Sequence, residues 1–143
     1  MIVLSEGIKR DVNNAFIEGH PIIVVGVTPD AEPTVSFRGT AQVLDDSTLA
    51  FWVRKADDSM LLSSIATHPV VVLIYTDMAK RRHYQFRGRA RRADEEATRT
   101  RVYESAHEFE QRQDPERKGT AVIVELTSVR GRGEDGPINL QAS

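Results

Sequence analysis

The chain has 143 residues, a length typical of one domain with a sizeable core. Its formal net charge of -2 gives no overall bias toward nucleic acid or acidic membranes. The absence of cysteine excludes disulfides, thiolate metal sites and cysteine nucleophiles, and it fits a reducing cytoplasm. The N-terminus lacks the pattern of a signal peptide and no apolar run reaches transmembrane length, so we expect a soluble, cytoplasmic protein with no membrane partner.

The first thirty residues predict a helix followed by a strand. Residues 5–18 carry apolar side chains such as Ile8 and Val12 at helical spacing, with Ser5 as the N-cap. A Gly-His-Pro sequence then ends the helix. Residues 22–28 form a short apolar, β-branched run, which predicts a buried strand.

The next stretch predicts a hairpin and a second helix. Residues 33–44 and 48–55 both alternate between apolar and polar side chains, and a short Asp-Asp-Ser turn joins them. Ser59 can cap a helix that begins near Met60 and ends before a His-Pro pair. A polar strand face, a basic strand end and a helix N-terminus meet here, as in a pocket for an anionic ligand.

The second half of the chain predicts three more strands. Residues 70–76 are almost wholly apolar, and residues 81–92 alternate. A long helical stretch follows at residues 94–113, and residues 120–129 form the last predicted strand. Residues 131–143 are rich in glycine and polar side chains, so we expect them to be weakly ordered.

Six strands and three helices predict a small antiparallel barrel. Most strands follow one another through short turns, which favours antiparallel pairing over the crossover helices of a parallel α/β sheet. We place the barrel domain at residues 1–130 and a C-terminal tail at residues 131–143.

No motif of metal or hydrolytic catalysis is present. The four histidines show no pairing at metal-ligand spacing, and the sequence has no G-x-S-x-G, P-loop or Rossmann fingerprint. His20 and His68 both precede proline at helix ends, which favours structural roles. His83 lies on the polar face of a predicted strand and is the one histidine that we keep as a functional candidate.

Arginines gather on the polar face of the strand at residues 81–92. One interpretation is a solvated face, balanced by the Asp-Glu-Glu run beside it; the other is recognition of a phosphate or another anion by guanidinium groups such as Arg87 and Arg89. Nucleic acid is less favoured as a partner because Tyr84 and Phe86 fall on the opposite face.

Three other cations indicate a ligand site more directly. Arg38, Arg54 and Lys55 each lie on or at the end of a hairpin strand, close to the predicted helix N-terminus at Ser59. Surface charges at strand ends are common, so a solvated surface is the alternative interpretation.

The order of these elements and four local strings resemble the pyridoxamine 5'-phosphate oxidase-like, FMN-binding split-barrel superfamily. The strings are Pro-Thr-Val-Ser-Phe-Arg-Gly from Pro33, Asp-Asp-Ser-Thr-Leu-Ala-Phe-Trp from Asp45, His-Pro-Val-Val-Val from His68, and Gln-Phe-Arg-Gly-Arg-Ala from Gln85. The resemblance extends over residues 5–129, and its specificity lies in the order and spacing of the strings.

The resemblance implies a mainly β fold with peripheral helices, namely a six-stranded antiparallel split β-barrel that forms a homodimer. It implies a flavin site, and we expect an FMN-binding oxidoreductase with a small-molecule substrate; the residue patterns above favour no metal and no nucleic-acid partner. In such proteins the flavin lies along the second and third strands, and its phosphate meets basic residues and the start of the following helix. The implied contacts in this sequence are Phe37, Arg38 and Gly39 at the ring or ribityl chain, Val53, Arg54, Lys55, Ser59 and Met60 at the phosphate, and His83 from one side or across the dimer.

The chain departs from these relatives at the phosphate end. Relatives that bind FMN often have Ser-Arg-Lys or Ser-x-Lys where this chain has Asp-Ser-Met-Leu at residues 58–61, and Arg54 and Lys55 are the cations that can compensate. The alternatives are a deazaflavin-dependent reductase, a non-redox ligand-binding or regulatory dimer and, less favoured, an RNA-binding barrel. The sequence assigns no substrate and no catalytic residue.

Overall fold

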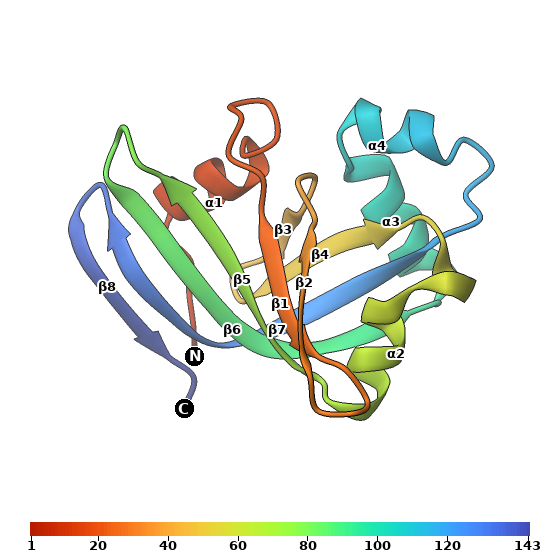
Figure 1. Cartoon of the computed structure of the whole chain (residues 1–143). Coiled ribbons are helices and arrows are strands. Elements are labelled where there is room, and N and C mark those ends of the chain that lie inside the picture. The colour runs from red at the N-terminus through yellow and green to blue at the C-terminus, as the bar shows by residue number, and fades with distance from the viewer.

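An antiparallel sheet of eight strands forms the centre of the molecule, and helices lie at its periphery (Figure 1). The structure, a computed structural model, describes all residues from Met1 to Ser143. The strands are β1 (Ile23–Val27), β2 (Pro33–Phe37), β3 (Gln42–Asp45), β4 (Thr48–Val53), β5 (Val70–Asp77), β6 (Arg82–Ala93), β7 (Thr120–Gly133) and β8 (Gly136–Gln141). The helices are α1 (Glu6–Asn13), the 3-10 turn η1 (Ala56–Asp58), α2 (Met60–Thr67), α3 (Glu96–Ser105) and α4 (Glu108–Gln113).

The sheet is open. Its strand order is β2-β1-β5-β6-β7-β4-β3, with β8 paired to β7, and every pairing is antiparallel. The edge strands β2 and β3 do not pair with each other, so the curved sheet has a split between its two ends. This confirms the predicted antiparallel split barrel with peripheral helices. No helix has both the length and the apolar character that a membrane span requires.

The predicted strand at residues 33–44 is two strands. β2 pairs with β1, whereas β3 pairs with β4, so only the second half of the run belongs to the predicted hairpin. A turn separates the halves: the Ala41 N–H donates to the Arg38 carbonyl at 3.0 Å. The apolar and polar alternation continues across this turn, which is why the sequence pattern hid the break.

The expectation of a weakly ordered tail is wrong. β7 continues to Gly133, across the boundary that we placed after residue 130, and β8 pairs with it along six positions from Ser128–Gln141 to Gly133–Gly136. Glycine allows the close approach of β7 and β6 here. At Gly131, where φ is +146°, a Cβ would meet the His83 carbonyl oxygen at 2.0 Å. Together with the break after β2, β8 raises the strand count from the predicted six to eight.

The helices begin where capping residues predict. Ser5 accepts a hydrogen bond from the Ile8 N–H, and Ser59 accepts one from the Leu62 N–H, both at 3.2 Å. The predicted helix at residues 94–113 is interrupted, because Ala106 adopts an extended backbone conformation and His107 Nδ1 then accepts from the Phe109 N–H at 2.9 Å to start α4.

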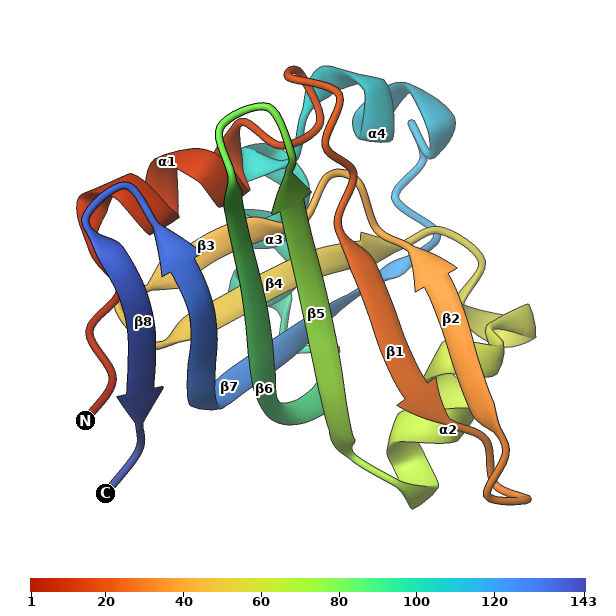
Figure 2. The same ribbon diagram turned by 60° about the vertical axis from the view of Figure 1, so that its left-hand side comes forward.

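The core has two parts separated by β4, whose six residues are all buried. Phe51 and Phe86 belong to the interior of the barrel, while Trp52 and Tyr103 pack in a smaller cluster between β4, β7 and α3. The alternation predicted for β6 is confirmed, since its apolar side chains are buried and its arginines from Arg87 to Arg91 are exposed. The outer face of the sheet, away from the barrel interior, carries no helix over β2, β1, β5 and β8 and the adjoining parts of β6 and β7 (Figure 2), whereas α3 covers the end of β6 and the start of β7.

The backbone of β6 leaves no room for a side chain at Gly88, which lies at a register shift against β7. A Cβ there would meet the Glu125 carbonyl oxygen at 2.5 Å and Val124 Cγ1 at 2.7 Å. We expect Gly88→Ala to lower the free energy of unfolding by about 1–3 kcal/mol through overpacking, as measured by urea denaturation. Gly26→Ala is the control, because a Cβ at that strand position makes only ordinary contacts from 3.6 Å outward. An equal loss in both variants would contradict this account.

Candidate functional site

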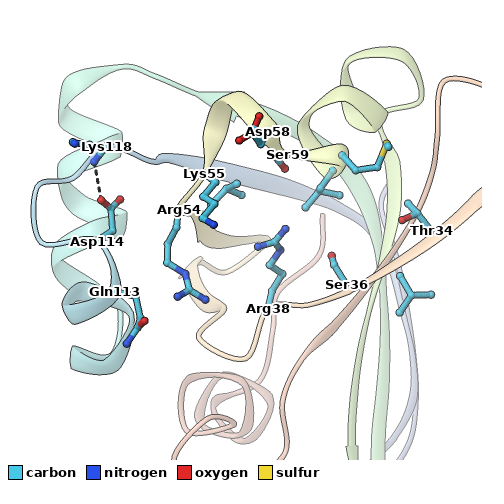
Figure 3. Close-up of a pocket in the computed structure, with 14 residues that line it drawn as sticks. Thr34, Ser36, Arg38, Arg54, Lys55, Asp58, Ser59, Gln113, Asp114 and Lys118 are labelled. Atoms are coloured by element: carbon cyan, nitrogen blue, oxygen red, sulfur yellow. Dashed lines mark hydrogen bonds between the residues drawn. The ribbon is translucent and has the colours of Figure 1, made fainter.

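A cavity of about 790 Å³ lies in the split, between the edge strand β2, the end of β4, the start of α2 and the loop after α4 (Figure 3). Its volume is that of a small-molecule or cofactor pocket. The residues that line it are Thr34, Val35, Ser36, Arg38, Val53, Arg54, Lys55, Asp58, Ser59, Met60, Leu61, Gln113, Asp114 and Lys118.

The cavity brings together six of the nine residues implied by the resemblance. They are Arg38, Val53, Arg54, Lys55, Ser59 and Met60. The remaining three, Phe37, Gly39 and His83, do not line it.

Phe37 and Gly39 face away from the cavity for different reasons. Along β2 the side chains alternate, so Ser36 lies toward the cavity while Phe37 is on the outer face of the sheet, where it is 68% exposed. Gly39 lies in the turn after β2 rather than inside a strand, which corrects the sequence prediction. A Cβ on Gly39 would meet the Phe16 ring at 3.3 Å and Pro21 at 3.6 Å, so this glycine faces the connection between α1 and β1.

His83 is the second residue of β6, and it pairs with Thr76 of β5 on one side and Arg132 of β7 on the other. Its side chain is exposed on the outer face of the sheet. A role for His83 in the site therefore stays a prediction that requires a second copy of the chain.

Arg38 is the most unusual cation of the cavity. Its Nε is buried and has no hydrogen-bond partner, and its guanidinium carbon lies 5.8 Å from the centre of the Phe51 ring. Burial lowers the pKa of Arg38; Glu110 opposes this shift and Arg54 adds to it. Figure 3 shows the side chain extending into the space between Arg54 and Ser36. Because a buried unpaired donor is costly, this group is suited to an anionic oxygen that a ligand supplies.

Glu110 of α4 lies behind the arginines and is itself buried. Its Oε1 accepts a hydrogen bond from the Thr40 hydroxyl at 2.6 Å. Its Oε2 is 3.0 Å from Arg54 Nε, an ion pair in which the N–H is not directed at the oxygen. The single carboxylate of Glu110 thus offsets only part of the charge of the Arg38 and Arg54 guanidinium groups. The three side chains together keep a net positive charge.

The start of α2 adds further donors to the cavity wall. The first N–H groups of a helix have no intrahelical partner, and the helix dipole places partial positive charge there. Ser59 caps this turn, with Lys55 and Asp58 nearby on the cavity wall. Asp58 is the one carboxylate at this end of the cavity, so it reduces the attraction for an anion without cancelling it.

Sequence reasoning missed the wall formed by the loop after α4. Asp114 there accepts three hydrogen bonds, from Trp52 Nε1 at 2.9 Å, the Lys118 N–H at 2.9 Å and the Gly119 N–H at 2.8 Å. Burial by itself raises the pKa of Asp114, but these hydrogen bonds outweigh it and lower the pKa below its ordinary value of 3.8. The loop is thereby held against β4, and Lys118 joins the cavity wall, with its exposed ammonium paired to Glu116 at 3.0 Å.

Thr34 and Ser36 were within reach of the sequence pattern, since they share the polar face of β2 that leads to Arg38. No pattern pointed to Gln113 or Lys118, which follow Thr34 and Ser36 by about eighty residues. No group of three or more histidine, aspartate or glutamate side chains is arranged to hold a metal ion.

No family model matches the sequence, and no curated protein resembles it in sequence. Solved structures do share its fold. HupZ of Group A Streptococcus has a TM-score of 0.67 at 18% identity, over 92% of this chain and 97% of its own. A pyridoxamine 5'-phosphate oxidase-related, FMN-binding protein of Nostoc punctiforme has a TM-score of 0.68 at 12% identity, over 90% and 82% of the two chains. An F420 reductase has a TM-score of 0.64 at 16% identity, over 88% and 98%.

These similarities establish the fold. The chain has the architecture of pyridoxamine 5'-phosphate oxidase-like, FMN-binding and F420 reductase proteins, as the resemblance in sequence implied. At such low identities the shared fold does not assign a function. A function must therefore be inferred from the residues of this chain.

Asp114 makes the cavity wall sensitive to pH. We expect Asp114→Asn to lower the free energy of unfolding near pH 7 by about 1–3 kcal/mol, since it removes a charged acceptor of three hydrogen bonds. The folded-state pKa is depressed, so the contribution of the carboxylate is present above about pH 4 and is lost as pH falls through the folded value. Urea denaturation should therefore show the difference between wild type and variant shrinking in acid. The exposed Asp135→Asn is the control, and a difference that stays constant down to about pH 2 would contradict the assignment.

Proposed function

We propose that the protein is a flavin-binding oxidoreductase of the pyridoxamine 5'-phosphate oxidase-like type, which binds FMN in the split and acts on a small-molecule substrate. The observation that carries the proposal is the buried, unpartnered Nε of Arg38 in a cavity with three further cations. The FMN-binding protein with the same fold supports the choice of cofactor. The proposal includes a cytoplasmic location, which the lack of cysteine fits.

The residues present fit the phosphate end of FMN. A phosphate carries up to two negative charges and accepts several hydrogen bonds, and Arg38, Arg54 and Lys55 supply charged donors within one cavity. Ser59 and the first turn of α2 would hold the phosphate from the helix side. Val53 and Met60 add the apolar wall.

When bound, the isoalloxazine ring would supply the electron transfer, and the chain would supply position and electrostatics. Arg38 would hold the phosphate or ribityl oxygens at the edge of β2. Glu110 would keep Arg54 in place from behind through their ion pair. Because Phe37 and Gly39 do not line the cavity, their contact with the ring stays a prediction.

A deazaflavin is the alternative cofactor. Lys118 extends the cavity wall to the loop after α4, beyond the group at β2 and β4, and a longer anionic ligand could reach it by displacing its surface ion pair with Glu116. The F420 reductase with the same fold supports a deazaflavin-dependent reductase as the second candidate.

We propose further that the protein is a homodimer. The outer face of β2, β1 and β5 has no helix over it and exposes Val35, Phe37 and Val70, with Phe37 68% and Val35 62% exposed; Val35, on the edge strand, also borders the cavity of the split. Apolar surface of this kind marks an interaction site, and a two-fold axis lets one face cover its own copy.

The cofactor assignment predicts how binding depends on the cations. We expect Arg54→Gln combined with Lys55→Gln to weaken FMN binding by about 2–4 kcal/mol, the scale of lost charge-assisted hydrogen bonds. Titrations that follow flavin absorbance, run in parallel with FMN and with the deazaflavin, measure the affinities and rank the two cofactors. Lys80→Gln, an exposed cation outside the cavity, should leave the affinity unchanged. Thermal unfolding checks that the double variant is folded.

Two results would overturn this assignment. Unchanged affinity in the folded double variant would place the phosphate elsewhere. If the purified wild-type protein shows no flavin spectrum and binds neither cofactor, the non-redox ligand-binding or regulatory dimer replaces the oxidoreductase.

The proposed homodimer can be tested by its mass in solution. Light scattering should give about twice the chain mass of 16.0 kDa at micromolar concentration. We expect Phe37→Asp to dissociate the dimer because it places a charge in the apolar part of the face. Ile17→Asp, at a side chain equally exposed but located between α1 and β1, should leave the dimer intact. A stable wild-type monomer would exclude this part of the proposal.

A further inference from the structure

The outer face of the sheet changes character across its strands. Its half on β2, β1 and β5 is apolar, whereas its half on β6, β7 and β8 carries arginine, glutamine and asparagine. A separate cavity of about 360 Å³ lies in the polar half, at its border with β5. Six residues line it: Val72, Gln85, Arg87, Ser128, Arg130 and Gln141.

Strand register brings the two arginines of this cavity together. Arg87 stands opposite Ser128, and Arg130 stands opposite Gln85, so Arg87 and Arg130 are diagonal neighbours on one face. Diagonal pairs on adjacent strands are within reach of long side chains.

No acidic residue neutralises this pair. Neither Arg87 nor Arg130 takes part in an ion pair, and no aspartate or glutamate lines the cavity. By contrast, Arg91 and Arg92 further along β6 each pair with a carboxylate. Two adjacent guanidinium groups with no counter-charge repel each other, and a bound anion would remove that repulsion.

We propose that this cavity is a second anion-binding site, distinct from the split, for a small molecule that carries a phosphate or carboxylate group. Two guanidinium forks can each bind such a group bidentately. The Ser128 hydroxyl and the Gln85 amide, neither of which is held by a hydrogen bond within the chain, supply neutral donors beside them. No lining residue is shared with the cavity of the split, so the site does not depend on flavin binding.

A small anion fits this surface better than a nucleic acid does. Recognition of single-stranded nucleic acid combines cations with exposed aromatic rings on which bases stack. The aromatic residues of β6, Tyr84 and Phe86, are only 1% and 0% exposed and lie inside the barrel. The cationic face therefore offers charge and hydrogen bonds without a stacking surface.

Titration calorimetry at low salt tests the site, with inorganic phosphate in one arm and succinate in the other. The Arg54→Gln and Lys55→Gln double variant serves as background, because it weakens the split as a competing anion site. We expect Arg87→Gln and Arg130→Gln each to weaken binding of the preferred anion by about tenfold. Arg89→Gln is the matched control: it removes the same charge from the same strand, but Arg89 does not line the cavity and stands opposite Glu125. Its effect should be less than about twofold.

Three outcomes would overturn the proposal. An equal loss in Arg89→Gln would show attraction by general charge rather than a built site. Dissociation of a dimer by Arg87→Gln or Arg130→Gln, without any effect on anion affinity, would make the pair an interface contact. Tight binding of single-stranded RNA that persists at physiological salt, with no measurable binding of either small anion, would assign the face to nucleic acid.

Discussion

The turn at residues 38–41 is the constraint on which the site depends. It ends β2 and sends the chain across to β3, so these two strands become the separate ends of one sheet instead of one continuous strand. Two hydrogen bonds fix the turn, from the Arg38 N–H to Ile22 and from the Ala41 N–H to Arg38. The split that results is the cavity, and Arg38, as the first residue after β2, is placed at its wall.

Burial of charge explains why α4 belongs to the site as much as the strands do. Arg38 is partly removed from water, and a guanidinium in that position needs a counter-charge nearby. Glu110 supplies one, and the Thr40 hydroxyl satisfies its other oxygen. Asp114 then ties the following loop to Trp52 of β4. Contacts within the chain thus hold the cationic wall in place, yet they leave one buried donor free.

Local patterns predicted the elements well, and failed where backbone geometry or distant contacts decided. Ser59 as a helix cap and the buried face of β6 follow from short-range sequence, and both are confirmed. The break after Phe37 is invisible because alternation continues through it. The glycines of the tail predict weak order, whereas Gly131 and Gly136 adopt positive φ within the β7–β8 hairpin. Lys118 joins the site through folding alone, so no spacing rule could include it.

The positive charge of the split comes from several elements, and this links ligand binding to the fold. The serine at the start of α2 is followed by Met60 and Leu61, neither of which is basic. The cations are contributed instead by the end of β2, the end of β4 and the loop after α4, at Arg38, Arg54 and Lys118. An anion held by all three would bridge the two ends of an open sheet. A ligand that binds only the folded state stabilises that state by mass action. A bound anion would therefore stabilise the folded arrangement of the two sheet ends, between which there is no strand pairing.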